Sequence, residues 1–142
     1  MASRQLLIFK LNGNDFGVDI THIDSIVPIN EIVKIPNTPV YVEGLMSLRG
    51  KVYTIFNLRK RFDLPSCEYN DNTKIVIVNV NSVSLGFIVD EVNEIKLIED
   101  ENMDNSPLSV AKLDKQFVNG VAKIEERIII VLDLEKTLAI TE

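Results

Sequence analysis

One pattern occurs twice in this chain: a short apolar strand, a tight polar turn and a second apolar strand. The first copy runs from Leu6 to Ile20 and turns at Asn12-Gly13, two residues that tolerate the positive φ of a hairpin turn. The second copy runs from Ile75 to Val89 and turns at Asn81-Ser82. Short apolar runs bounded by such turns predict β-hairpins.

The two hairpins match each other at a constant offset of 69 residues, since Phe16–Ile26 aligns with Leu85–Ile95 without a gap. A second correspondence links Arg49–Phe62 with Asn119–Leu138, and the later copy carries a few extra residues around 125–127. We interpret the pattern as an internal duplication within a single domain, 1–142, with approximate halves 1–69 and 70–142. Chance matching among apolar positions is the alternative.

Each half predicts a hairpin, a bend, two further strands and a short helical turn. Asn57 and Asp133 are suitable N-caps for those closing turns. Valine and isoleucine greatly outnumber alanine, which favours sheet over helix. Short strands separated by Gly, Asn and Pro turns therefore predict an all-β chain of two small barrels packed together.

The chain is acidic, with 21 Asp and Glu against 15 Lys and Arg and a formal net charge of −6. Binding to nucleic acid or to an anionic membrane relies on clustered cations, so we expect neither kind of partner. We find no apolar run long enough to insert in a membrane and no signal peptide, and we therefore expect a cytoplasmic protein.

Catalytic and metal-binding residues are hard to place. His22 is the only histidine and resembles a surface residue of a bend, and Cys67 resembles an ordinary loop thiol. The segment 44–52 fails as a phosphate loop and 99–104 fails as a calcium loop, while 59–61 reads as the solvated face of a helical turn. We predict no enzyme activity, no metal and no cofactor, and a protein that acts through its surfaces.

The segment 36–52, PNTPVYVEGLMSLRGKV, resembles the signature of the CheW family, the coupling proteins of bacterial chemotaxis. Similar stretches follow the family's order along nearly the whole chain, at residues 16–20, 70–78, 86–92, 120–122 and 130–136. The resemblance implies two intertwined five-stranded SH3-like β-barrels with short helical turns, whose halves exchange strands.

The resemblance also implies a non-enzymatic adaptor. Such a protein bridges the cytoplasmic helical hairpins of methyl-accepting chemoreceptors to the regulatory domain of the histidine kinase CheA, and couples receptor state to kinase activity. It would be monomeric when isolated and would reach membrane-associated receptor arrays through its partners. One alternative is a CheW-like domain taken from a kinase or from a coupling protein with a receiver domain, although the Met1 start favours a separate chain. A small nucleic-acid-binding β-barrel is a more distant alternative.

By resemblance, a receptor-binding groove lies between the barrels and includes Ile23, Ile26, Gly44, Arg49, Val92 and Ile95. Two equivalent apolar bends could hold a helix by i/i+3/i+4 anchors, although the four aliphatic residues could equally be core. Arg49 lies between apolar segments and is expected to need a partner carboxylate. Ser25 stands where the family often has a glutamate, which leaves Asp24 or Glu43 as that partner.

The resemblance places a kinase-binding surface on the first barrel, at Pro39, Val40, Tyr41, Val42 and Leu45. These residues could instead cover the end of the barrel. The loop around Pro107 and Leu108 matches a region that the family uses in receptor-array rings.

Overall fold

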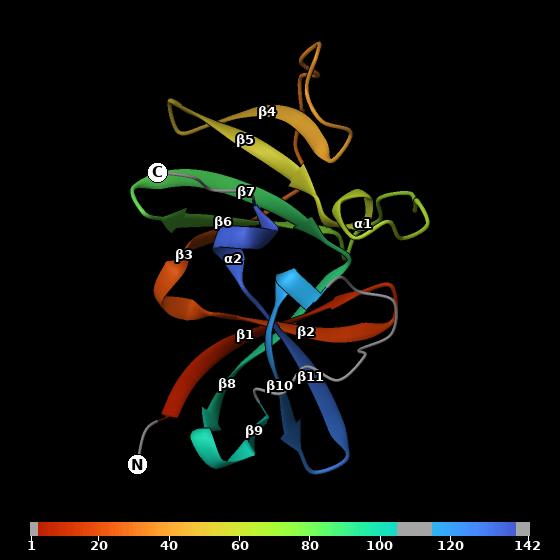
Figure 1. The fold of residues 1–142 in the computed structure, drawn as a ribbon. Helices are drawn as coiled ribbons and strands as arrows, with labels where there is room; N and C mark the ends of the chain where they lie inside the picture. The colour runs from red at the N-terminus through yellow and green to blue at the C-terminus, as the bar shows by residue number, and fades with distance from the viewer. Residues whose placement is uncertain (1–2, 105–114, 139–142) are drawn as a thin grey trace.

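The computed structural model describes residues 3–104 and 115–138, which form two β-sheets (Figure 1). The first sheet contains β1 (Ser3–Leu11), β2 (Asn14–Asp19), β8 (Glu91–Glu99), β9 (Met103–Asp104), β10 (Val118–Ile124) and β11 (Arg127–Leu132). The second contains β3 (Ile23–Pro28), β4 (Val42–Leu48), β5 (Lys51–Asn57), β6 (Lys74–Val80) and β7 (Val83–Val89).

The helices are short: α1 (Leu58–Arg61), α2 (Leu134–Thr137) and the 3-10 turns η1 (Ile20–His22), η2 (Asp100–Asn102) and η3 (Lys115–Phe117). Within the described part of the chain, no helix has the length and apolar character needed to cross a membrane. The chain is thus all-β with short helical turns, as predicted.

Each sheet combines a hairpin from one half of the chain with strands from the other half. The strand order is β8-β1-β2-β11-β10-β9 in the first sheet and β3-β6-β7-β5-β4 in the second. The hairpin β1–β2 therefore lies among late strands, and β6–β7 lies among early strands (Figure 1). The joins between the halves include two parallel contacts, β2 with β11 and β5 with β7.

The strand registers show that the two sheets are equivalent. Gly17 lies opposite Val131, and Gly86 lies opposite Ile55. The two glycines differ by 69 positions and their partners by 76, so one offset relates the hairpins and a larger one relates the later strands. The two offsets hold through the pairings of β1 with β2 and of β6 with β7, and of β4 with β5 and of β10 with β11, including a β-bulge in β4 and a matching one in β10.

The bulges correct the predicted alignment of the later segments. Arg49-Gly50 forms the turn between β4 and β5, with φ of +52° and +82°. Asn119-Gly120 lies instead at the bulge of β10, where its counterpart is Glu43-Gly44. The prediction aligned two Xaa-Gly pairs that look alike but differ in backbone role. In the structure, the extra residues fall between β8 and β10 and not at 125–127, which is the counterpart turn.

A phenylalanine-rich core lies between the two sheets. Phe9 stacks on Phe16 with centroids 5.9 Å apart, and Phe62 contacts Phe117 at 5.3 Å. Each sheet also has a smaller hydrophobic cluster of its own, around Ile8 and Ile129 in the first sheet and around Ile55 and Ile77 in the second. The large central cluster explains how the halves form one body, because both contribute to it.

The helical caps are confirmed. The Asn57 side chain accepts a hydrogen bond from Lys60 N at 3.1 Å, and Asp133 accepts one from Lys136 N at 3.2 Å. Each cap begins a single helical turn that returns apolar residues to the core.

The basic cluster 59–61 is not a solvated helical face, so that prediction is wrong. The Arg59 side chain is only 13% exposed and binds Asp90 with two nitrogens. Asp90 also accepts from Asn12 N at 2.8 Å. Burial acts to raise the pKa of the Asp90 carboxyl, but the hydrogen bonds from Arg59 and Asn12 outweigh it and hold this pKa below its ordinary value.

Arg61 joins the two helical turns. Its guanidinium donates to the Thr137 carbonyl at 2.7 Å and to the Lys136 carbonyl at 3.0 Å, at the end of α2. The same group lies 4.3 Å from the centroid of the Tyr41 ring and 4.7 Å from that of Phe117. Since Tyr41 and Phe117 are equivalent in the two halves, Arg61 lies between matching rings.

Candidate functional site

The edge strands β3 and β8 carry the four aliphatic residues expected to form the receptor-binding groove. Ile23 and Val92 lie at the start of these strands, as the first residue of β3 and the second of β8, and pack, partly buried, against the central core. Ile26 and Ile95 lie three residues further along the same strands and are 39% and 56% exposed. The core alternative thus describes Ile23 and Val92, while Ile26 and Ile95 are accessible to a partner.

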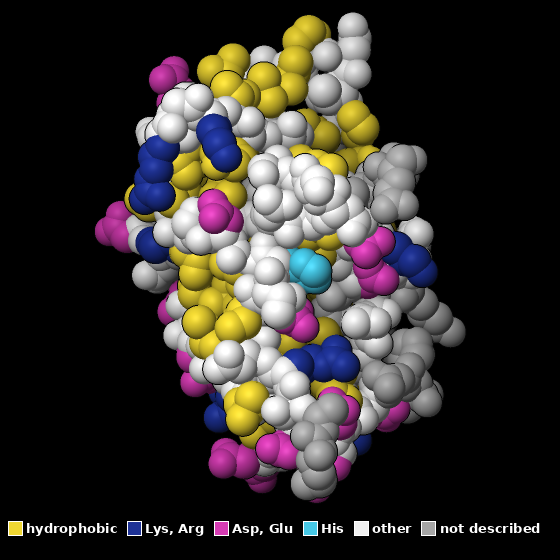
Figure 2. Space-filling view, turned by 90° about the vertical axis from the view of Figure 1, so that its left-hand side faces the viewer, with side chains coloured by type: hydrophobic (Ala, Val, Ile, Leu, Met, Phe, Trp, Pro, Cys, Tyr) yellow, Lys and Arg dark blue, Asp and Glu magenta, His cyan; other side chains and the backbone are white. Residues whose placement is uncertain are grey.

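The registers place the two exposed isoleucines on the same face as the packed pair. Ile26 lies opposite Val76 and Ile95 lies opposite Leu7, and both partners belong to the central cluster. The two isoleucines therefore share the inner face of their sheets but project at its rim. Figure 2 shows hydrophobic side chains over the side of the molecule that carries β3 and β8, with Lys and Arg groups near its upper end. Leu97 extends this exposed set along β8.

Gly44 and Arg49 lie on or beside β4, at the opposite edge of the second sheet from β3. Gly44 is buried with φ of +150°, and an added Cβ would lie 2.2 Å from the Val33 carbonyl oxygen. This close approach permits the paired hydrogen bonds between Val33 and Leu45, both 2.8 Å. Gly44 therefore has a structural role in holding the loop before β4.

Arg49 does not have the carboxylate partner that was expected. Its side chain is exposed at the β4–β5 turn, and among the described residues it forms no ion pair. Glu43 instead accepts from Asn57 Nδ2 at 3.0 Å and lies 3.5 Å from Lys60 Nζ. Asp24 is exposed on β3 and is not paired with Arg49 either. A turn residue points into solvent, so burial imposes no need for a partner.

The residues expected at the kinase-binding surface divide into exposed and packed members. Pro39 and Val40 are exposed, Val40 at 72%. Tyr41 is partly buried and stacks on Phe56 at 5.6 Å. Val42 packs against the central core and Leu45 is partly buried in β4.

Val33 adds to the exposed set near Pro39 and Val40, and sequence reasoning missed it. It is 61% exposed and its backbone is bonded to β4. No periodic pattern marks it, because it lies in the irregular segment before β4. Pro107 and Leu108 lie outside the described residues.

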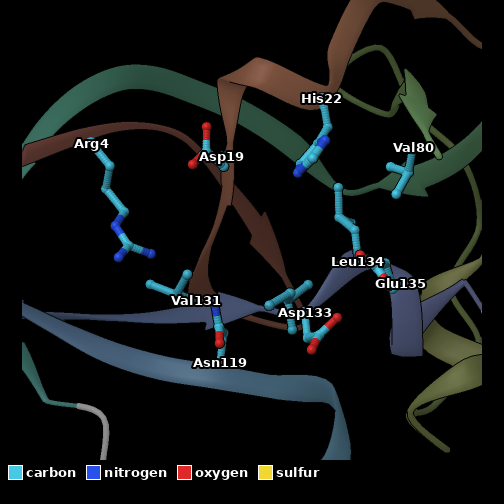
Figure 3. Close-up of a pocket in the computed structure, with 10 residues that line it drawn as sticks. Arg4, Asp19, His22, Val80, Asn119, Val131, Asp133, Leu134 and Glu135 are labelled. Atoms are coloured by element: carbon cyan, nitrogen blue, oxygen red, sulfur yellow. The ribbon is translucent and has the colours of Figure 1, made fainter.

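A polar cavity of about 220 Å3 lies where β1, η1, β11 and α2 meet. Figure 3 shows around it Asp19 at the end of β2 and His22 of η1, with Asp133 and Glu135 at the start of α2. His22 is partly exposed, as expected for a bend, and sequence reasoning did not connect it with these carboxylates. No group of three His, Cys, Asp or Glu side chains in the described chain is placed to hold a metal ion.

Comparison with known proteins gives one consistent result. The family described as the CheW-like domain matches residues 5–142. The chain is 28% identical to chemotaxis protein CheW of Bacillus subtilis, covering 96% of this chain and 88% of that one. It is 30% identical to chemotaxis protein CheW of Treponema pallidum, covering 97% and 84%.

A solved structure agrees with these sequence matches. The scaffolding protein TtCheW from Thermoanaerobacter tengcongensis has a TM-score of 0.85 and 32% identity, over 94% of this chain and 86% of that one. At this identity and coverage, the likeness extends to sequence as well as to fold.

Proposed function

The chain belongs to the CheW-like family, a family of chemotaxis coupling scaffolds rather than enzymes, and on that premise we propose that it bridges chemoreceptors to the histidine kinase CheA. The observation that carries the proposal is the full-length match to named chemotaxis CheW proteins together with the fold of a scaffolding protein. It would act at the inner face of the membrane, recruited by its partners.

The proposed receptor-binding surface consists of Ile23, Ile26, Val92 and Ile95, together with Arg49 and Gly44 on the β4–β5 hairpin at the other edge of the second sheet. Ile26 and Ile95 are the exposed aliphatic anchors that an amphipathic helix requires. Arg49 supports the proposal in a second way: its guanidinium is free of carboxylates within the described chain and is available to one on a receptor helix.

The proposed kinase-binding surface consists of Pro39, Val40, Tyr41, Val42 and Leu45. Its exposed members, Pro39 and Val40, lie in the segment before β4, apart from β3 and β8 (Figure 1). Two separate apolar surfaces on a rigid β scaffold suit a protein that holds two partners at once. A partner that binds one kinase state better than the other shifts the kinase population, which is how a scaffold couples signals. The loop around Pro107 and Leu108 is a further proposed contact, in receptor-array rings.

The test separates the two surfaces. We expect saturable 1:1 binding of the purified, monomeric chain to the CheA regulatory domain by calorimetry, at about micromolar Kd or tighter, about −8 kcal/mol. Val40→Asp should weaken kinase binding and leave receptor binding intact, and Ile95→Asp should do the reverse.

Ile128→Asp is the matched control, because Ile128 is 57% exposed on β11 but belongs to neither proposed surface. It should leave both affinities unchanged. The absence of any complex between folded partners would contradict the proposal, and so would loss of both affinities in a single correctly folded variant.

A further inference from the structure

The two halves contain cavities at equivalent places, and among residues 3–104 and 115–138 a chain segment covers only the first of them. In the first half, Leu11 and Asn57 line a space of about 10 Å3. Their counterparts at offsets 69 and 76, Val80 and Asp133, line the cavity of about 220 Å3 in the second half. Arg59 and Glu135 are likewise equivalent and line the first and the second cavity, respectively.

An exposed segment of the chain itself covers the first cavity. Cys67, Glu68 and Tyr69 lie along it, between α1 and β6. The Tyr69 hydroxyl hydrogen bonds with Asn57, whose amide donates to Glu43 at 3.0 Å. Burial and the nearby Glu43 carboxylate together raise the pKa of Tyr69 to about 12. The site thus accepts a neutral phenol next to an amide and a carboxylate.

The second cavity has the same polar pair with the residue types exchanged. Asp133 stands in place of Asn57, and Asn119 stands in place of Glu43 (Figure 3). Asp133 uses Oδ1 to cap α2, which leaves Oδ2 to accept from a further donor. The lining contains no aromatic residue and, within the described chain, no counterpart of Cys67–Tyr69.

We propose that this second cavity is a docking site for a tyrosine side chain on an extended segment of a partner protein. The phenol hydroxyl would donate to the Asp133 carboxylate and accept from the Asn119 amide. A cavity of about 150 Å3 holds a benzene ring, so the space suffices for the ring of tyrosine.

The charges around the cavity predict which residues flank that tyrosine in the partner sequence. The lining contains Arg4 and His22 against the three carboxylates of Asp19, Asp133 and Glu135. The excess of negative charge favours a tyrosine flanked by Lys or Arg over one flanked by acids. The first cavity differs, because Arg59 there replaces a carboxylate and the resident segment carries Glu68.

The experiment titrates the labelled full chain with acetyl-Lys-Tyr-Lys-amide and follows amide chemical shifts by NMR. We expect saturable shifts centred on Asn119, Asp133 and Glu135. The same peptide with Phe should bind about tenfold more weakly, because a hydrogen bond to a charged group is lost. A peptide with Glu in place of both lysines should also bind more weakly.

Asp133→Ser removes the carboxylate but keeps an N-cap residue, so α2 should remain folded while the preference for Tyr over Phe is lost. Asn57→Ser is the matched control in the first cavity and should leave the peptide affinity unchanged. Asn119→Ala provides a second test on an exposed residue, with a several-fold loss expected.

Shifts absent from the cavity, or equal binding of the Tyr and Phe peptides, would overturn the proposal. So would an equal effect of Asn57→Ser and Asp133→Ser. None of these measurements uses a receptor or a kinase, so their outcome is independent of the proposed function.

Discussion

Replacing Asp90 with Asn should destabilise the protein, because the ionised Asp90 side chain links helix α1 to the β1–β2 hairpin. Arg59 comes from α1, Asn12 from the β1–β2 turn, and Asp90 from the junction of β7 and β8. In Asp90→Asn, the new amide oxygen still accepts from Asn12 N, but Arg59 loses its anionic partner. The connection would remain, in a weakened form.

The magnitude follows from burial. Breaking a fully buried ion pair costs about 3–5 kcal/mol, and an exposed pair is worth about 0–1 kcal/mol. The side chains of Arg59 and Asp90 are 13% and 30% exposed, and one hydrogen bond survives the substitution, so we expect a loss of about 2 kcal/mol. For a chain of this size, that loss lowers Tm by about 4–8 °C.

The assay is urea unfolding followed by circular dichroism, at several pH values. The pKa of Asp90 is lowered in the folded protein, so the carboxylate stabilises the fold above its ordinary pKa of about 3.9. That contribution is lost as the pH falls through the folded-state pKa, and wild type and Asp90→Asn should converge in strongly acidic solution. Glu94→Gln is the matched control, since Glu94 pairs with Arg127 in an exposed position, and it should unfold like the wild type at neutral pH.

Two results would refute this reasoning. The first is an Asp90→Asn variant as stable as the wild type at neutral pH. The second is a stability difference that persists unchanged at acidic pH, because a pair that depends on ionised Asp90 cannot survive its protonation.

Three further predictions follow from single positions. Ultraviolet titration should show one phenol ionising near pH 12 that is absent in Tyr69→Phe; because this pKa is raised in the folded state, its contribution to stability should be lost as pH rises from about 10. Gly44→Ala should cost more than the roughly 1–3 kcal/mol typical of backbone strain, because its Cβ would also clash with the Val33 carbonyl, whereas Gly13→Ala meets open space and should cost only the strain; equal urea midpoints would contradict this. Arg49→Asp should fold normally, within about 0.5 kcal/mol of wild type, and lose receptor binding, whereas global unfolding in a melting experiment would make Arg49 structural.

The features predicted correctly from the sequence are those that depend only on neighbouring residues. Asn12-Gly13 and Asn81-Ser82 form the two hairpin turns, and Asn57 and Asp133 cap the two helical turns. Each of these outcomes depends on a residue's own backbone freedom or on a hydrogen bond to a residue three positions away. Sequence alone is sufficient for such features.

The exposed part of the candidate site could be identified only from the tertiary packing. Ile23 and Ile26 look alike in sequence, yet one packs against the core and the other projects at the rim of its sheet. Arg49 and Arg59 both lie next to apolar segments, yet the first ends in solvent and the second in an ion pair with Asp90. Which of two similar residues is buried depends on strands that are distant in the chain.

The sequence by itself determined an all-β chain built from a repeated unit, because short apolar runs bounded by turn residues predict strands. The family resemblance implied that the halves exchange strands. Only the tertiary structure decided which strands pair, and that equivalent residues differ by 69 positions in the hairpins and by 76 in the later strands. It also decided that, in the described part of the chain, the segment carrying Tyr69 covers one of two equivalent cavities and no matching segment covers the other. These outcomes rest on contacts between residues far apart in the chain, and such contacts leave no period or motif in the segments that make them.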